Sequence, residues 1–189
     1  MSNKVFLGII TALILGVVGF IVLSGKNSPK QPPLGTSHKD QGANHIPRGS
    51  AHPAYNSDPP NSGWHYSDSN APVQWGVYTQ EVLDEEFLHN QEHGGVIITY
   101  RPDLPADQIK KLQALFAPPY SDPKFKPSKA VVTPRSKNTK PIGLAAWGYT
   151  LNLDTYDEEK IKNFYLQRVS KSPEPTAGPF NTPINQANQ

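Results

Sequence analysis

Apolar and polar positions divide the chain into segments of different character. The first, Val5 to Leu23, contains no charged residue and only Thr11 as a polar side chain. About 20 apolar residues suffice for a helix to span the hydrocarbon core of a bilayer. The apolar core of a cleaved signal peptide is shorter, at about 7–15 residues. We therefore predict an uncleaved transmembrane anchor within residues 1–25.

Polar residues dominate the following segment, residues 26–48, which is rich in Gly, Pro, Ser, Asn, Gln and Lys. Such a composition cannot bury enough apolar surface to offset the entropy lost on ordering. We predict a disordered linker here, in which His38 and His45 are solvated. The same reasoning predicts a disordered tail over residues 172–189, where Pro, Asn, Gln and Thr prevail.

Strand-like segments alternate with helical ones between these two regions, which predicts one folded domain over residues 49–171. Pro72 to Tyr78 is typical of a short edge strand, and the β-branched run Val96 to Tyr100 of a buried one. Ala130 to Thr133 and Ile142 to Leu151 are also strand-like. The short polar turn between them favours an antiparallel hairpin.

Helical periodicity appears at two places after the central strand. Leu104 to Phe116 has one apolar face and Pro105 in its first turn. A last helix is predicted to begin at the cap Asp154, with Asp157 at its third position. Its buried face is formed by Ile161, Phe164, Tyr165 and Val169.

A shorter helix is predicted to begin in the acidic turn at Asp84 and run through His93, where Gly94 would end it. The fold class is therefore α+β. We expect a small mixed sheet of about three to five strands with two packed helices, in the chain order β-β-α-β-β-α, and a right-handed first β-α-β crossover.

Composition restricts the binding partners and the cellular compartment that are plausible for this protein. The net charge is only +2 and the lysines are scattered, which argues against nucleic-acid binding. The absence of cysteine excludes disulfides and thiolate metal ligands. The positive charges of Lys4 and the α-amino group before the predicted anchor are balanced by those of Lys26 and Lys30 after it, so charge does not indicate which end of the anchor is cytoplasmic. We expect residues 5–23 to contact the lipid bilayer of the cell membrane and the domain to lie on the extracytoplasmic side.

His89-Asn90-Gln91-Glu92-His93 carries the candidate chemistry. A separation of four places His89 and His93 on one side of either a helix or a strand, whereas Glu92 lies beside His89 only on a helix. The segment matches the metallopeptidase pattern H-x-x-E-H. Gly94 and the strand that follows interrupt the required helix, and no third ligand is evident. We therefore assign no catalytic residue and favour a protein that is not an enzyme, with a zinc metallopeptidase as the less favoured alternative.

A metal site is the leading prediction for this segment. The imidazoles of His52, His65, His89 and His93 would converge, with Glu92 nearby. Imidazole ligands suit Cu(II) or Zn(II), and Cu(I) thioether chemistry is excluded because no methionine follows Met1. Two alternatives remain open. The histidines could form a structural hydrogen-bond network, or the domain could be a metal-free interaction module that presents its aromatic, proline-rich loop to an envelope protein.

Three motifs resemble a known family. These are YNSDPPNSGWHY at Tyr55–Tyr66, GVY at Gly76–Tyr78 and LHNQEHGGV at Leu88–Val96. Together they are similar to the bacterial domain of unknown function family 3105, over about residues 52–166. The usual family form has Thr and Pro near Asn61 and Trp64, and Leu at the position of Gln91, while the histidines and Glu92 are intact. The resemblance implies an exported, membrane-tethered domain and lends no enzymatic activity.

Overall fold

The computed structural model describes residues 32–117, 122–175 and 184–185. The chain divides into two units, Met1–Pro33 and Leu34–Gln189, and the fold below is that of the second unit. The predicted transmembrane run lies outside the described residues, as does most of the predicted tail. Among the helices of the described part, none is both long and apolar enough to cross a membrane.

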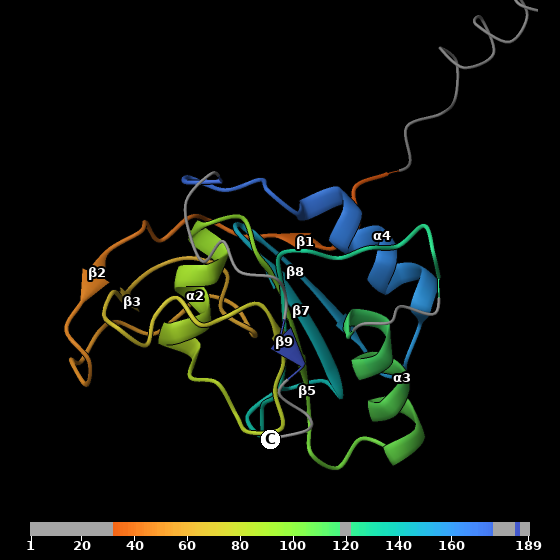
Figure 1. Ribbon diagram of the computed structural model, residues 1–189. Coiled ribbons are helices and arrows are strands. Elements are labelled where there is room, and N and C mark those ends of the chain that lie inside the picture. The colour runs from red at the N-terminus through yellow and green to blue at the C-terminus, as the bar shows by residue number, and fades with distance from the viewer. Residues whose placement is uncertain (1–31, 118–121, 176–183, 186–189) are drawn as a thin grey trace, which may run out of the picture. The chain divides into compact units, whose positions relative to one another are not determined.

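A mixed sheet forms the centre of the unit (Figure 1). Its seven strands are arranged in the order β1-β8-β7-β5-β6-β4-β9, and a separate pair is formed by β2 and β3. The α+β class and the mixed sheet are thus as predicted, although the sheet has more strands than expected. In chain order the strands are β1 (Thr36–Ser37), β2 (His45–Ile46), β3 (His65–Tyr66), β4 (Gly76–Val77), β5 (Val96–Tyr100), β6 (Ala130–Pro134), β7 (Ile142–Ala146), β8 (Tyr149–Leu153) and β9 (Ile184–Asn185).

Three helices are described, one more than the two expected to pack on the sheet: α2 (Asp84–Glu92), α3 (Ala106–Phe116) and α4 (Glu158–Arg168). Helix α2 lies on one side of the sheet, and α3 and α4 lie on the other (Figure 1). The predicted segment that contains α3 is confirmed, with Pro105 at its N-cap. Helix α4 begins later than predicted, because Asp157 accepts a hydrogen bond from the Lys160 amide and is the cap.

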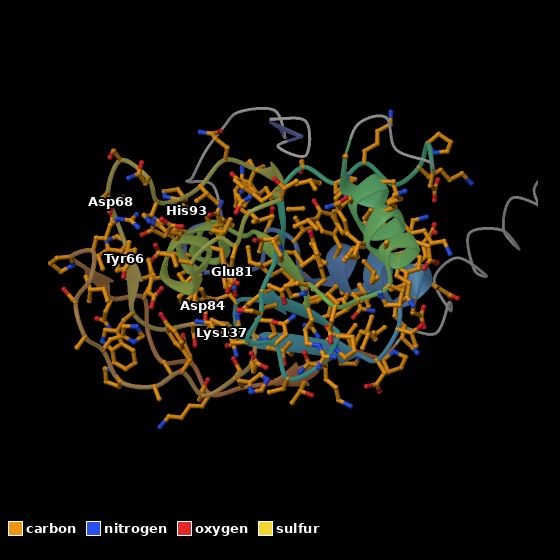
Figure 2. The ribbon with its side chains drawn as sticks, turned by 90° about the horizontal axis from the view of Figure 1, so that it is seen from below. Tyr66, Asp68, Glu81, Asp84, His93 and Lys137 are labelled. Atoms are coloured by element: carbon orange, nitrogen blue, oxygen red, sulfur yellow. The ribbon has the colours of Figure 1, made fainter. Side chains whose placement is uncertain are left out.

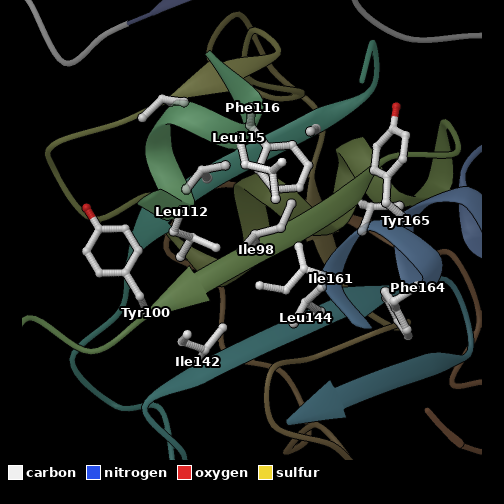
Figure 3. Packing of buried hydrophobic residues seen from close by; sticks show 14 of the residues in the cluster. Ile98, Tyr100, Leu112, Leu115, Phe116, Ile142, Leu144, Ile161, Phe164 and Tyr165 are labelled. Carbon is white, nitrogen blue, oxygen red and sulfur yellow. The ribbon is translucent and has the colours of Figure 1, made fainter. Parts of the chain in front are cut away.

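The central strand β5 supplies apolar side chains to both faces of the sheet. All five of its residues are buried. Because side chains alternate along a strand, Ile98 and Tyr100 belong to the larger core beneath α3 and α4 (Figure 3). Ile97 belongs to the smaller core, which also contains Phe87 and Leu88 of α2.

The predicted hairpin between Ala130–Thr133 and Ile142–Leu151 is wrong. β5 lies between these segments, parallel to β6 and antiparallel to β7. The β5-α3-β6 connection places β6 on one edge of β5, so β7 pairs with the other edge. The expected long strand instead folds on itself as the β7-β8 hairpin, whose turn contains Gly148 with φ +74°. The right-handedness of the crossover stays a prediction.

The predicted linker is ordered where the structure describes it. Strand β1 pairs with β8 and strand β2 pairs with β3. The His38 amide also donates to the Gly148 carbonyl at 2.9 Å. Backbone pairing of this kind needs few apolar side chains, which explains why composition did not predict it. The segment from Leu34 to Arg48 therefore belongs to the folded unit.

Candidate metal centre

Helix α2 is the element on which the centre is built. Asp84, Glu85 and Glu86 occupy its first turn, where acidic side chains favour the positive end of the helix dipole. It ends at Glu92, and Gly94 follows with φ +83°, a conformation that glycine adopts without steric cost. The predicted glycine stop is confirmed.

Polar side chains of α2 are buried instead of facing solvent. Asn90 makes two hydrogen bonds with the backbone of Val73, at 2.7 and 3.0 Å. The amide nitrogen of Gln91 donates to the Pro60 carbonyl at 3.0 Å. The Gln91 contact fastens the helix to the proline-rich loop, and the Asn90 contacts fasten it to the segment before β4. These bonds explain why so polar a helix can be buried.

A short parallel strand pair brings a histidine from the predicted linker to this loop. In the pairing of β2 with β3, His45 lies opposite His65, and Ile46 lies opposite Tyr66. The rings of His45 and His65 meet edge to face, with centroids 4.9 Å apart. Strand β3 in turn contacts α2, because Nδ1 of His89 lies 2.7 Å from the Tyr66 carbonyl oxygen.

His45, His65, His89 and Glu92 form a group in which one ligand atom of each lies within 4.8 Å of the others. Oε2 of Glu92 is the common neighbour. It lies 3.2 Å from Nε2 of His45, 3.2 Å from Nε2 of His65 and 3.8 Å from Nε2 of His89. Three imidazole edges therefore converge on one carboxylate oxygen.

The hydrogen bonds of Nδ1 in His65 and His89 determine whether Nε2 of each ring faces the centre with a hydrogen or with a lone pair. Nδ1 of His65 lies 2.9 Å from the Gly63 carbonyl oxygen, and Nδ1 of His89 has the Tyr66 carbonyl as its partner. A carbonyl oxygen only accepts, so each Nδ1 bears the hydrogen and Nε2 of a neutral ring presents a lone pair. Both lone pairs then face a carboxylate oxygen, which also only accepts. Such an arrangement is favourable when a cation or an added proton lies among these atoms.

Burial and charge set the protonation of the group. Burial, the largest influence on His89, lowers its pKa to about 4, so this ring is neutral at pH 7. Burial would raise the pKa of Glu92, but its contacts with the ring nitrogens of His65 and His45 outweigh burial and lower the pKa to about 2. At neutral pH the centre thus combines an anionic carboxylate with at least one neutral imidazole.

Three of the four side chains in the group are buried. The side chains of His65, His89 and Glu92 are 0%, 7% and 4% exposed, whereas that of His45 is 49% exposed. An ion could therefore reach the group past His45 while the other three ligands stay fixed by their surroundings.

The structure places the other two predicted ligands outside this group. His52 has both ring nitrogens engaged: Nδ1 lies 2.8 Å from the Pro53 carbonyl oxygen and Nε2 lies 3.1 Å from Oε1 of Glu85. His93 follows the end of α2, with its ring centroid 4.7 Å from that of His89. It belongs instead to a neighbouring group with Glu92 and Glu174. Figure 2 shows His93 and Tyr66 in the same part of the unit.

Sequence reasoning missed His45 and Glu174, which lie in the segments predicted to be disordered. The signal at His45 was weak: Ile46 beside it is one of few aliphatic residues in that segment. No comparable signal marks Glu174. Both positions depend on backbone pairing between distant segments, which periodicity does not reveal.

Fold and site together define a small α+β domain with a buried histidine and carboxylate group at the end of a polar helix. The chain belongs to the family described as "Protein of unknown function (DUF3105)", whose profile matches residues 48–180. This range contains His65, His89, Glu92 and Glu174, whereas His45 precedes it. Comparisons with curated proteins and with solved structures returned no match.

Proposed function

We propose that this domain binds a divalent transition metal, Cu(II) or Zn(II), through His45, His65, His89 and Glu92. One observation carries the proposal. The Nε2 atoms of His65 and His89, whose Nδ1 hydrogens point to backbone carbonyls, converge with His45 on Oε2 of Glu92. Backbone partners of this kind are the ones that orient metal-binding histidines.

The spacing of the ligand atoms supports the proposal. Four ligands at about 2.0–2.1 Å from a tetrahedral ion lie roughly 3.3 Å from one another. The three contacts of Glu92 Oε2, at 3.2, 3.2 and 3.8 Å, are close to that spacing. Of these three, only the contact between Nε2 of His89 and Oε2 of Glu92, at 3.8 Å, must shorten to reach that spacing.

The ligand set favours holding a metal over catalysis by it. Sites that bind zinc structurally use four protein ligands, whereas catalytic sites keep one position open. Glu92 also lies among the ligands, whereas in the H-x-x-E-H peptidases the glutamate is the general base. His93 is absent from the three-imidazole group, unlike the second histidine of that pattern.

We further propose that the domain works at the outer face of the cell membrane, tethered by residues 5–23. The uncharged run from Val5 to Leu23 supports an anchor, and a ligand set without thiolate suits an oxidising exterior. Protease digestion of intact cells should degrade the domain if this orientation is correct. Full protection in intact cells, with digestion only after lysis, would overturn it.

The metal proposal is tested by titrating the full chain, in detergent and freed of metal by a chelator, with Cu(II) or Zn(II). His45→Ala should weaken binding at least about tenfold, since even the partners behind metal ligands change affinity about 10–100-fold. His38→Ala is the matched control, because this nearby histidine bonds to Thr150 and lies outside the group. An unmodified chain that binds neither metal, or equal affinity in both variants, would overturn the proposal.

A further inference from the structure

His93 leaves a buried nitrogen without a partner. The residue is 6% exposed, and among the described residues its Nδ1 has no hydrogen-bond partner. The carboxylate oxygen Oε2 of Glu174 lies 3.8 Å from this nitrogen. A buried polar atom of this kind is unusual in a folded protein and is often explained by an ion or water.

The chain after α4 returns to the end of α2 and brings Glu174 to this nitrogen. The Ser170 amide donates to the Gly94 carbonyl at 2.8 Å. Both the hydroxyl of Ser172 and the amide of Glu174 donate to the Glu92 carbonyl, at 2.6 and 3.0 Å. A Cβ at Gly94 would lie 2.7 Å from the Ser170 Cα, so this close approach requires glycine.

Lys129, which directly precedes β6, links the end of α2 to the segment that contains Glu174. Its ammonium donates to the His93 carbonyl at 2.8 Å and also to the Pro175 carbonyl. The segment that contains Glu174 is thus held at both of its ends. Glu174 is itself 56% exposed at its side chain, so it faces the buried His93 from the solvent side.

Glu92, His93 and Glu174 each offer a ligand atom within 4.8 Å of the others. Glu92 is shared between this group and the three-imidazole group. A carboxylate has two oxygens and can therefore contact two ions at once. Two carboxylates placed side by side also repel each other, and a divalent cation between them would remove that repulsion.

We propose that Glu92, His93 and Glu174 form a second cation position, so that the domain holds two divalent ions that share Glu92. This inference rests on the proposed function for the first position. Two carboxylates and one imidazole make a harder ligand set than three imidazoles and one carboxylate, and they suit Zn(II) or Mn(II) more than Cu(II). The segment Ser170–Pro175, which we call the returning segment, then packs against the end of α2 and supplies Glu174 as a ligand of the second position.

The stoichiometry of Zn(II) binding tests the proposal. The full chain in detergent, freed of metal, is dialysed against buffered Zn(II), and bound zinc is measured per chain. The unmodified chain should bind about two ions, as in two-metal sites. Glu174→Gln should bind about one, with the tighter of the two affinities unchanged. Glu159→Gln is the matched control, because it removes the same charge from an exposed position on α4.

The outcomes separate the two proposals. If the unmodified chain and Glu174→Gln both bind one ion, the second position is overturned and the three-imidazole centre stands. If both bind two ions, the second ion lies elsewhere and the second position is likewise overturned. If the unmodified chain binds none, both proposals fall together. Because Glu174 is largely exposed, its replacement leaves the core of the domain unchanged.

Discussion

Arg135 joins two of the three segments that carry the candidate metal centre, and its replacement tests how these segments are held together. Its guanidinium donates to both carboxylate oxygens of Asp84, at 2.8 and 3.0 Å. It also donates to Asp58 and to Asn138. Asp84 begins α2, which carries His89, and Asp58 lies in the loop that leads to His65.

Arg135→Met should destabilise the domain strongly. The side chains of Arg135 and Asp84 are 5% and 3% exposed, so the substitution leaves a buried carboxylate without its main partner. Breaking a buried pair in this way costs about 3–5 kcal/mol. Lys137, 3.0 Å from Asp84 and beside it in Figure 2, retains part of the interaction. We therefore expect a loss of about 3 kcal/mol in the free energy of unfolding, at the lower end of that range.

The assay is urea denaturation of the full chain, followed by tryptophan fluorescence, with thermal unfolding as a second readout. A loss of about 3 kcal/mol corresponds to roughly 6–12 °C in Tm for a domain of this size. Arg101→Met is the matched control. Arg101 makes the same two-pronged contact with Asp103, but these side chains are 36% and 68% exposed. The control should change stability by less than about 1 kcal/mol.

Equal, small effects of the two substitutions would refute the reasoning that burial makes the Arg135 network important. Metal affinity provides an independent check. Because Arg135 contacts the loop that leads to His65 and the start of the helix that carries His89, Arg135→Met should weaken metal binding under conditions where the variant is still folded, whereas Arg101→Met should not.

Three further predictions concern the glycine stop, an acid-sensitive ion pair and metal removal. Both Gly94 and Gly148 have positive φ, but only at Gly94 would an added Cβ meet backbone atoms, those of Ser170. Gly148→Ala should therefore cost roughly 1–2 kcal/mol and Gly94→Ala more than that. Equal urea midpoints for the two variants would contradict this. Burial would raise the pKa of Asp58, but hydrogen bonds from Thr139 and the Arg135 ion pair outweigh it and lower the pKa. Asp58 therefore stabilises the fold above its unfolded pKa of about 3.9 and loses that contribution as the pH falls through its lower folded pKa. The stability difference between Asp58→Asn and the unmodified chain should be large at pH 7 and shrink towards pH 3, and a constant difference would contradict this. Chelation of a metal present at about 100 times its Kd should lower the free energy of unfolding by about 2.7 kcal/mol, and an unchanged Tm after chelation would argue that no metal was bound.

Elements with strong local patterns could be predicted from the sequence. β5 was predictable because five successive residues suit a strand buried on both faces. Helix α3 was predictable from its apolar face and the proline at its start. The stop at Gly94 followed from the conformational freedom of glycine. Each of these signals lies within a few residues of the feature that it predicts.

Features that depend on pairing between distant segments were not predictable. β5 lies between β6 and β7 in the sheet, whereas the short turn after β6 predicted that β6 and β7 would pair directly. His45 reaches the centre only because β2 adds to β3 through backbone hydrogen bonds. His52 was expected at the centre on proximity in sequence, yet the structure pairs it with Glu85.

The candidate centre shows the same division. The four-residue spacing correctly placed His89 and His93 near each other, and their ring centroids are 4.7 Å apart. Which of the two faces the other histidines depended on where α2 ends. Because the helix stops at Glu92, His89 and Glu92 point to the three-imidazole group, while His93 lies against the returning segment.

Electron paramagnetic resonance of the full chain loaded with one equivalent of Cu(II) tests the central claim most directly. Nitrogen hyperfine couplings report how many imidazoles bind the copper. We predict couplings from three imidazoles in the unmodified chain, and from two in His45→Ala. A spectrum of copper bound by water and carboxylate alone, without nitrogen couplings, would contradict the assignment of His45, His65 and His89 as metal ligands.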